Sequence, residues 1–199
     1  MHRDIKPSNF LLGVEKYQWL IYIIDFGLSK RYQDPKTQEH IRFRSKKSIT
    51  GTACFLSVNT HLGMEQSRRD DIESIGYTLL YLTTGILPWQ ACVAKDKIEL
   101  YNKIKEVKMR TSITVLCKDL PSQFGSYFKY CKKLRFTEKP NYFYLRNLFK
   151  QVMISRGYIN NYKYDWILRT DDGRSQSREQ VHTRLQTYSF WDSGIYVNL

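Results

Sequence analysis

Two short segments near the N-terminus carry the residue types that phosphoryl transfer requires. They read H-R-D-I-K-P-S-N over residues 2–9 and D-F-G over residues 25–27. Asp4 can accept or orient the proton of a hydroxyl nucleophile, and Lys6 can neutralise charge on the transferred phosphate. Asn9 and Asp25 supply oxygen ligands, which Mg²⁺ prefers over nitrogen and sulfur. These residues predict transfer of a phosphate group with magnesium as the counter-charge.

The spacing of the two segments strengthens this interpretation, because each residue alone is a weak signal. An aspartate at the end of an apolar run is most often a turn or cap residue, and a D-F-G tripeptide occurs in unrelated proteins. Together the segments match H-R-D-x-x-x-x-N followed, about twenty residues later, by D-F-G. These are the catalytic-loop and magnesium-binding motifs of protein kinases. Their order and distance predict a kinase that uses ATP and Mg²⁺.

The elements that position these residues follow from the apolar pattern. Residues 9–12 and the apolar run at 19–24 are predicted as short strands, the second buried and ending at Asp25. Residues 28–63 are polar, basic and aperiodic, which is typical of a functional loop. Helices are expected at 69–84, apolar on nearly every side and therefore central, at 95–107, and after the capping residues Ser122 and Asn141. The predicted fold class is mainly α, with short β-strands near the N-terminus.

Composition excludes several classes of protein. The chain has 199 residues, a formal charge of +13 and 42% hydrophobic residues, too many for a disordered chain. Its longest apolar run, 19–24, is too short to cross a bilayer, and the N-terminus has no apolar stretch of signal-peptide type, so we expect no membrane insertion. Four cysteines without a C-x-x-C pair favour a cytoplasmic or nuclear location. The basic excess suits a polyanionic substrate, a nucleic acid or a solvated lysine-rich face.

Several further segments resemble the casein kinase 1 family. They are Thr50-Gly51-Thr52-Ala53, Ser57-Val58-Asn59-Thr60-His61-Leu62-Gly63, Glu65-Gln66-Ser67-Arg68-Arg69-Asp70-Asp71, Leu87-Pro88-Trp89-Gln90, Lys108-Met109, Leu116-Cys117-Lys118 and Arg135-Phe136 with Lys139-Pro140. Most kinases carry A-P-E where this chain has S-V-N. The resemblance covers residues 1–168, a partial kinase domain from the catalytic loop onward, and leaves 169–199 as a tail. It implies the C-terminal lobe of a serine/threonine kinase, monomeric when completed by an N-terminal lobe, that uses Mg-ATP on acidic or already phosphorylated proteins.

The resemblance also implies roles for residues outside the two motifs. Thr52 matches the residue that hydrogen-bonds the catalytic aspartate and lysine, and Asp71 matches the one that holds the catalytic-loop backbone. Leu11 and Ile24 match the floor and wall of the adenine pocket, although both residue types are equally ordinary in a core. Asp71 would also suit the start of a helix through the helix dipole. Arg3, within the first motif, is expected to support the site.

Four cations in the long loop form a second candidate binding feature, the basic cluster. It consists of Arg42, Arg44, Lys46 and Lys47. By the resemblance this loop is the activation segment, which faces the docking position of the peptide substrate. Coulomb attraction there would speed the encounter with an acidic protein substrate. The alternative is a solvated run of charges without a partner.

Two positions depart from the family pattern. Casein kinase 1 enzymes usually have an arginine where this chain has Cys54 and a lysine at the position of Leu100, and the pair grips a phosphate already on the substrate. An arginine suits phosphate through its planar fork of donors, which neither residue here provides. We therefore expect a preference for acidic over phosphate-primed substrates, with Lys47 and its neighbours steering, unless Lys97 takes over the phosphate.

The sequence lacks the segments with which kinases clamp ATP. None of its ten glycines forms G-x-G-x-x-G, and nothing resembles the V-A-I-K strand. Three interpretations stay open: a fragment of an active enzyme, a catalytically inactive short product that binds substrates or regulators as a scaffold, and a basic nucleic-acid binder. The retained catalytic and metal-binding residues favour the first. The lack of a basic–aromatic recognition motif disfavours a specific nucleic-acid partner.

Overall fold

The computed structural model describes residues 1–159 together with 161 and 164. Residues 1–9 and 25–159 form one compact unit, which we call the body, and residues 10–24 belong to another. The predicted tail, 169–199, and the domain boundary predicted at residue 168 lie outside the described residues.

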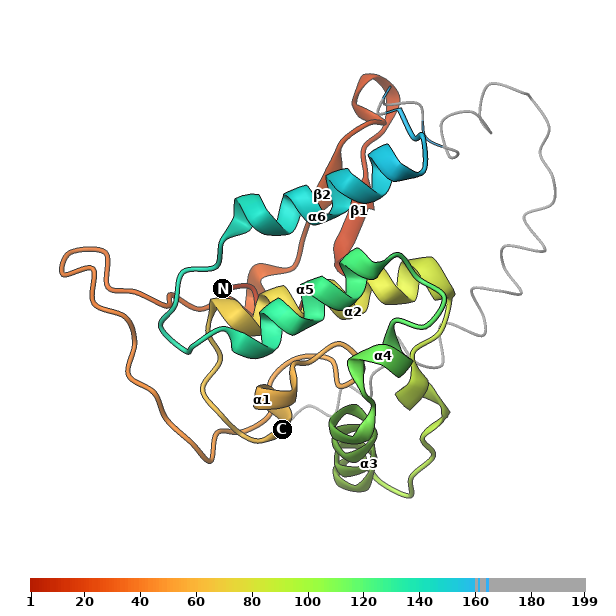
Figure 1. Ribbon diagram of the computed structural model, residues 1–199. Helices are drawn as coiled ribbons and strands as arrows, with labels where there is room; N and C mark the ends of the chain where they lie inside the picture. The colour runs from red at the N-terminus through yellow and green to blue at the C-terminus, as the bar shows by residue number, and fades with distance from the viewer. Residues whose placement is uncertain (160, 162–163, 165–199) are drawn as a thin grey trace. The chain divides into compact units, whose positions relative to one another are not determined.

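Helices dominate the body (Figure 1). They are α1 (Val58–His61), α2 (Arg68–Thr84), α3 (Lys97–Arg110), α4 (Ile113–Leu116), α5 (Ser122–Lys133) and α6 (Tyr142–Ser155), with 3₁₀ turns at Pro7–Asn9, Phe26–Leu28 and Pro88–Ala91. In the described part of the chain, no helix is both long and apolar enough to cross a membrane. The predicted mainly α fold class is confirmed.

Helix α2 runs through the centre of the body, and side chains fix both of its ends. The Asp70 carboxylate accepts a hydrogen bond from the Ser67 N–H (2.7 Å), which satisfies a donor that the start of a helix leaves unpaired. Gly85 ends the helix with a φ of 77°, a left-handed conformation that glycine adopts at little cost. Predicted over 69–84, the helix starts at Arg68.

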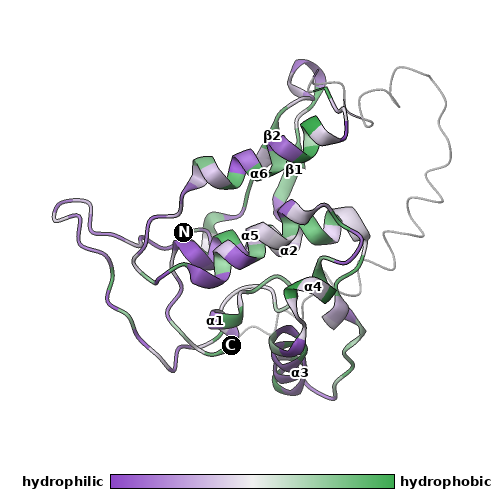
Figure 2. Ribbon diagram, in the orientation of Figure 1, coloured by the Kyte–Doolittle hydropathy of each residue, from purple (hydrophilic) through white to green (hydrophobic). Residues whose placement is uncertain are grey.

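The core of the body lies between α2, α5 and α6, with α5 packed against both of the others (Figure 1). Its buried side chains are Ile72, Tyr127, Cys131, Leu134, Leu145 and Leu148. Close packing of α2 on α5 needs a glycine at position 76, because a Cβ there would lie 2.9 Å from ring atoms of Tyr127 and Phe128. Hydrophobic and hydrophilic residues alternate along α5 and α6 in Figure 2, as expected of helices with one face in a core.

The other predicted helices are present, and some of their ends differ. The carboxylate of Asp96 accepts a backbone N–H of the first turn (2.8 Å), so the helix predicted at 95–107 lies at 97–110. Ser122 is the first residue of α5 rather than its cap. Asn141 caps α6 as predicted, with its side-chain oxygen accepting a backbone N–H at 2.9 Å.

The long loop predicted at 28–63 is irregular over residues 29–57. An isolated bridge joins Gln33 to His40 within it, and α1 occupies the last part of the predicted segment. The loop is mostly hydrophilic (Figure 2). All four cysteines lie in the described residues and none of them forms a disulfide bond.

Residues 10–24 form a β-hairpin. Strand β1 (Phe10–Leu12) pairs antiparallel with β2 (Ile21–Ile23), and a 3₁₀ turn at Glu15–Tyr17 lies between them. The strands predicted at 9–12 and 19–24 are therefore real but shorter. The predicted burial of the second strand is wrong, because all three β2 residues are exposed. An apolar run predicts a strand but not what covers it, and the two strands of residues 10–24 do not cover each other's faces.

Candidate active site

The first turn of α2 holds the backbone of the H-R-D segment, residues 2–9. Asp71 accepts hydrogen bonds from the backbone N–H groups of His2 (2.6 Å) and Arg3 (2.9 Å). Arg3 has a φ of 72°, a left-handed conformation that costs a non-glycine residue free energy. Its Nε donates to the Leu28 carbonyl (2.5 Å). The segment is thus tied both to α2 and to the turn that contains D-F-G.

The carboxylate of Asp4 is the centre of the site. Its Oδ1 accepts hydrogen bonds from both the N–H (2.9 Å) and the hydroxyl (2.7 Å) of Thr52. Its Oδ2 lies 3.2 Å from the ammonium of Lys6. Asp4 is only 7% exposed, and burying a carboxylate costs free energy that such hydrogen-bond and ionic partners offset. One oxygen is therefore fixed by the long loop, and the other is directed towards a lysine.

Asn9 ends the H-R-D segment and faces back towards Asp4. Its side chain is buried at the end of the 3₁₀ turn Pro7–Asn9. The amide nitrogen donates to the Asp4 carbonyl (2.8 Å) and lies 3.4 Å from the Asp4 Oδ2. Because the nitrogen is engaged with Asp4, the amide oxygen is the atom of Asn9 that can ligate a cation.

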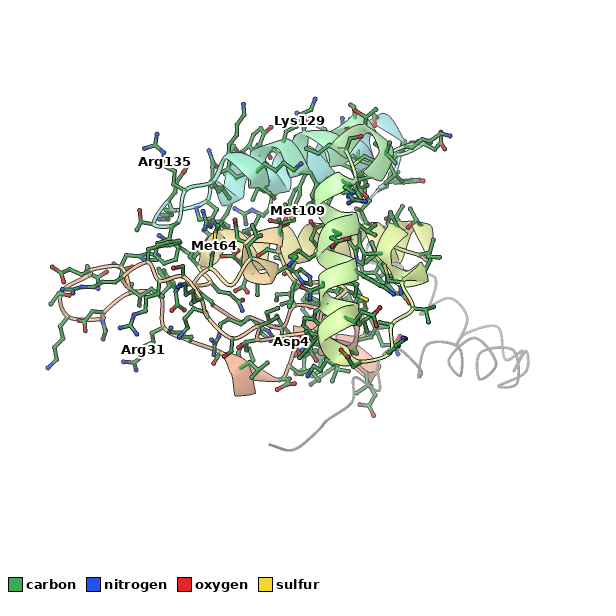
Figure 3. All side chains as sticks on the ribbon, turned by 90° about the horizontal axis from the view of Figure 1, so that it is seen from below. Asp4, Arg31, Met64, Met109, Lys129 and Arg135 are labelled. Carbon is green, nitrogen blue, oxygen red and sulfur yellow. The ribbon has the colours of Figure 1, made fainter. Side chains whose placement is uncertain are left out.

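Gly51 allows the long loop to approach the H-R-D segment closely. Its φ is 110°, and a Cβ at this position would lie 2.5 Å from the Arg3 carbonyl oxygen and 2.6 Å from the Leu56 side chain. The hydroxyl of Tyr101, on α3, donates to the Gly51 carbonyl (3.3 Å). In Figure 3, Asp4 lies towards the N-terminal end of α3, where Tyr101 is, and Met109 marks the other end of the helix. Helix α3 therefore helps to place the loop against the Asp4 carboxylate.

Asp25 follows the hairpin in a left-handed conformation, with a φ of 62°. It is exposed, and its carboxylate accepts a hydrogen bond from the Gly27 N–H (3.3 Å). The Asp25 carboxylate and the Asn9 amide oxygen are both hard oxygen donors, which fit Mg²⁺ bound together with substrate phosphates. Among the residues that the structure describes, no group of three or more His, Cys, Asp or Glu side chains offers an alternative metal site.

The two residues predicted for the adenine pocket belong to the hairpin unit. Leu11 lies in β1 and Ile24 directly follows β2, and they are 48% and 36% exposed. The body therefore brings together four of the predicted site residues and leaves Leu11 and Ile24 on the other unit. The four that meet are Asp4, Lys6, Asn9 and Thr52.

All four side chains of the basic cluster are exposed. One of them, Lys47, has an acidic neighbour: its ammonium lies 4.0 Å from the buried carboxylate of Glu65, which also pairs with Lys30 (2.8 Å). The backbone of the cluster is held as well, because the N–H of Glu65 donates to the Arg44 carbonyl (2.8 Å) and that of Lys47 to the Gly63 carbonyl (2.8 Å). Part of the charge of Lys47 is therefore compensated.

Asp70 joins the S-V-N segment to α2, and the sequence interpretation assigned it no role. Its Oδ1 accepts a hydrogen bond from the Ser57 hydroxyl (2.6 Å), and the same hydroxyl oxygen accepts the Thr60 N–H (3.1 Å) at the start of α1. Burial raises the pKa of Asp70 to about 6, against the hydrogen bonds from Ser57 and Ser67 that lower it. The loop thus has a fixed anchor just after the site.

Lys108, on α3, is a second residue whose role the sequence did not reveal. It is 5% exposed, and its ammonium donates to the carbonyl oxygens of Ala53 (3.1 Å) and Leu56 (2.5 Å). The same ammonium lies 4.5 Å from the ring centroid of Tyr77 and 4.7 Å from that of Trp89, within cation–π range. Lys108 therefore holds the stretch of loop that directly follows Thr52.

Burial lowers the pKa of the Lys108 ammonium to about 7, although the nearby charge of Glu73 raises it. Burial and the nearby charge of Lys108 lower the pKa of His61 to about 3. One signal in the sequence could have found this lysine, because it lies four residues after the apolar Ile104 and so on the same face of the helix.

The comparison with known proteins agrees with this geometry. A family model described as the protein kinase domain matches residues 1–152, which is most of the chain and includes both motifs and the whole of the Asp4 site. The carboxylate fixed by Thr52, the adjacent lysine and the asparagine that faces it are the parts that kinases use in phosphoryl transfer. The chain therefore belongs to the protein kinase family.

Proposed function

We propose that this chain is part of a serine/threonine kinase of the casein kinase 1 type, which transfers the γ-phosphate of ATP to serine or threonine in acidic proteins. The observation that carries the proposal is the Asp4 carboxylate, with one oxygen held by Thr52 and the other facing Lys6. The S-V-N segment and its neighbours support the casein kinase 1 type.

The geometry gives each of these residues a part in the reaction. Thr52 occupies Oδ1 of Asp4, so Oδ2 is the oxygen that can accept the proton of the substrate hydroxyl. Lys6, 3.2 Å from that oxygen, can move its charge onto the transferred phosphate when substrate is bound. The dense contacts around Asp4 fix its direction before substrate arrives, and such positioning lowers the barrier by several kcal/mol.

Asn9 and Asp25 would hold magnesium through their side-chain oxygens. When bound, the ion would neutralise the negative charge of the ATP phosphates. The protein contributes two features of this arrangement. The amide nitrogen of Asn9 is turned to the Asp4 carbonyl, which directs its oxygen the other way, and the left-handed backbone at Asp25 is stabilised by the contact with Gly27.

The basic cluster supports acidic substrates rather than phosphate-primed ones. Its exposed cations can attract an acidic peptide, an effect that salt should weaken. The ion contact of Lys47 with Glu65 leaves more of this role to Arg42, Arg44 and Lys46. Cys54 is 8% exposed, and as a thiol it cannot provide the charge-assisted fork with which an arginine binds phosphate.

The test uses the chain joined to a kinase N-terminal lobe that supplies a glycine-rich loop and a strand lysine. We expect transfer to acidic serine and threonine peptides, little transfer to the matched tyrosine peptide, and no gain from a phosphoserine upstream of the target. Asp4→Asn should lower kcat about 10²–10⁴-fold, while Asp119→Asn, at an exposed loop position, should leave it unchanged. Equal activity of the two variants would refute the assigned role of Asp4.

A further inference from the structure

A polar pocket lies apart from the Asp4 site. It has a volume of about 380 Å³ and is formed by the long loop, the first residue of α2 and the connection between α5 and α6. Its lining residues are Tyr32, Gln33, Gln38, His40, Arg68, Thr137 and Lys139. In Figure 3, Arg31 and Arg135, which precede two of these segments, lie towards the same side of the view and away from Asp4.

Arg68 lines this pocket, and one of its guanidinium donors has no hydrogen-bond partner. Its Nη2 donates to the Thr137 carbonyl (2.8 Å), and its guanidinium lies 4.4 Å from the centroid of the Tyr32 ring. These two contacts fix the plane of the guanidinium. Its Nε is buried without a hydrogen-bond partner, an arrangement that costs free energy unless a ligand or water completes it.

His40 presents a second buried nitrogen without a partner. Its Nδ1 lies 2.9 Å from the Ile41 carbonyl, which can only accept, so this nitrogen carries the proton. The other nitrogen, Nε2, is buried with no hydrogen-bond partner. The ring is held edge-on against Phe136, with centroids 4.8 Å apart.

The formally charged residues that line the pocket, Arg68 and Lys139, are both basic. Lys139 is exposed at its edge, and no aspartate or glutamate is among the lining residues. Asp34, in the same loop, directs its carboxylate instead to the backbone N–H groups of Lys36 (2.8 Å) and Thr37 (2.9 Å). The Asp34 carboxylate is therefore engaged by its own turn and is not among the residues that line the pocket.

The loop wall of the pocket is already formed. The amide nitrogen of Gln33 donates to both the backbone and the side-chain oxygen of Gln38, each at 2.7 Å. Gln38 has a φ of 60°, and the bridge between Gln33 and His40 closes the turn. A preformed wall lowers the ordering cost of binding.

We propose that this His40–Arg68–Lys139 pocket binds a phosphate group, free or as a phosphoserine side chain. An oriented guanidinium suits a phosphate because its donors match the oxygens in pairs, and the lysine adds a point charge. The volume admits a phosphorylated side chain, and the mostly polar lining disfavours an apolar ligand. The proposal concerns a site remote from Asp4 and stands independently of the proposed kinase activity.

The test is calorimetric titration of the 199-residue chain with three probes: a phosphoserine peptide, the same peptide unphosphorylated, and inorganic phosphate. We expect the phosphoserine peptide and inorganic phosphate to bind and the unphosphorylated peptide not to bind. Added salt should lower the affinity of the two probes that bind. Lys139→Ala and Arg68→Lys should each lower affinity, the second roughly tenfold because lysine lacks the planar fork. Lys129→Ala, at an exposed position on α5, is the matched control and should have no effect.

The outcomes separate the two sources of the phosphate. Tighter binding of the phosphopeptide than of inorganic phosphate identifies a peptide ligand, and equal binding identifies the free anion. Because Arg68 also contacts Thr137, the melting temperature of each variant is measured, and Lys139→Ala keeps the test valid if Arg68→Lys unfolds. The proposal is wrong if neither phosphorylated probe binds, if Lys139→Ala leaves affinity unchanged, or if Lys129→Ala weakens binding equally.

Discussion

At the residue scale, Asp71 carries two short hydrogen bonds that hold the H-R-D segment in place. Asp71→Ala should lower the free energy of unfolding by about 2–4 kcal/mol, because it leaves the N–H groups of His2 and Arg3 without their charged acceptor. Urea denaturation measures the effect. Glu106→Ala, at an exposed position on α3, is the control, and a loss no larger than that of the control would contradict the role of Asp71.

The lowered pKa of Lys108 predicts how the stability of the fold depends on pH. Its pKa falls from 10.5 in the unfolded chain to about 7 in the fold, so between these values the unfolded chain binds a proton that the folded chain does not. Its contribution to stability is therefore full above 10.5 and is lost as the pH falls through about 7. The stability of the wild type relative to Lys108→Met should rise with pH across this window.

Denaturant titrations at several pH values measure this difference. The comparison isolates the titration of Lys108. The methionine variant also loses the hydrogen bonds to Ala53 and Leu56, but this loss shifts its unfolding free energy by a similar amount at every pH. Other titrating groups are shared by the two proteins and largely cancel. Lys129→Met, which removes an exposed lysine, should give a pH profile parallel to that of the wild type. A parallel profile for Lys108→Met as well would show that the buried ammonium keeps its ordinary pKa.

At the element scale, the packing of α2 on α5 depends on Gly76, which has no room for a Cβ, whereas Gly125 on α5 has room for one. Gly76→Ala would place a Cβ 2.9 Å from the rings of Tyr127 and Phe128, whereas a Cβ at Gly125 would meet only Ile113 at 3.8 Å. Both glycines lie inside helices, where alanine is intrinsically favoured by about 0.5–1 kcal/mol.

The two substitutions should therefore have opposite signs. Gly125→Ala should stabilise the body by about 0.5–1 kcal/mol, and Gly76→Ala should destabilise it by about 1–3 kcal/mol through overpacking. Thermal and urea unfolding of the two variants under the same conditions measure this contrast. Stabilisation by both would mean that α5 can shift away from α2 without cost.

At the scale of the whole molecule, the body brings Asp4, Lys6, Asn9 and Thr52 together. Because the sequence contains no G-x-G-x-x-G and no V-A-I-K segment, the purified 199-residue chain should transfer phosphate at a negligible rate, with the γ-phosphate not held in line. Radiolabel transfer to casein is the measurement. Robust turnover that Asp4→Asn abolishes would show that the chain clamps ATP by another route.

What the sequence determined by itself is local. The spacing of H-R-D and D-F-G predicted the chemistry, and the apolar pattern located the helices now seen as α2, α3, α5 and α6, because motif spacing and helical periodicity are written in neighbouring residues. The same local signal correctly predicted a strand in the run at 19–24. It wrongly predicted that the strand is buried, because burial depends on which other segments pack against the strand.

The tertiary structure decided which distant residues meet. Only folding shows that the carbonyls of Ala53 and Leu56 surround Lys108, and that His40 and Arg68 line one pocket with Lys139. Thr52 was assigned through a family resemblance, and nothing in its own neighbourhood indicates Asp4. Such contacts join segments tens of residues apart, and they form because the packing of α2 against α5 and of α3 against α1 fixes the loops between these helices. No periodicity in the chain encodes that packing.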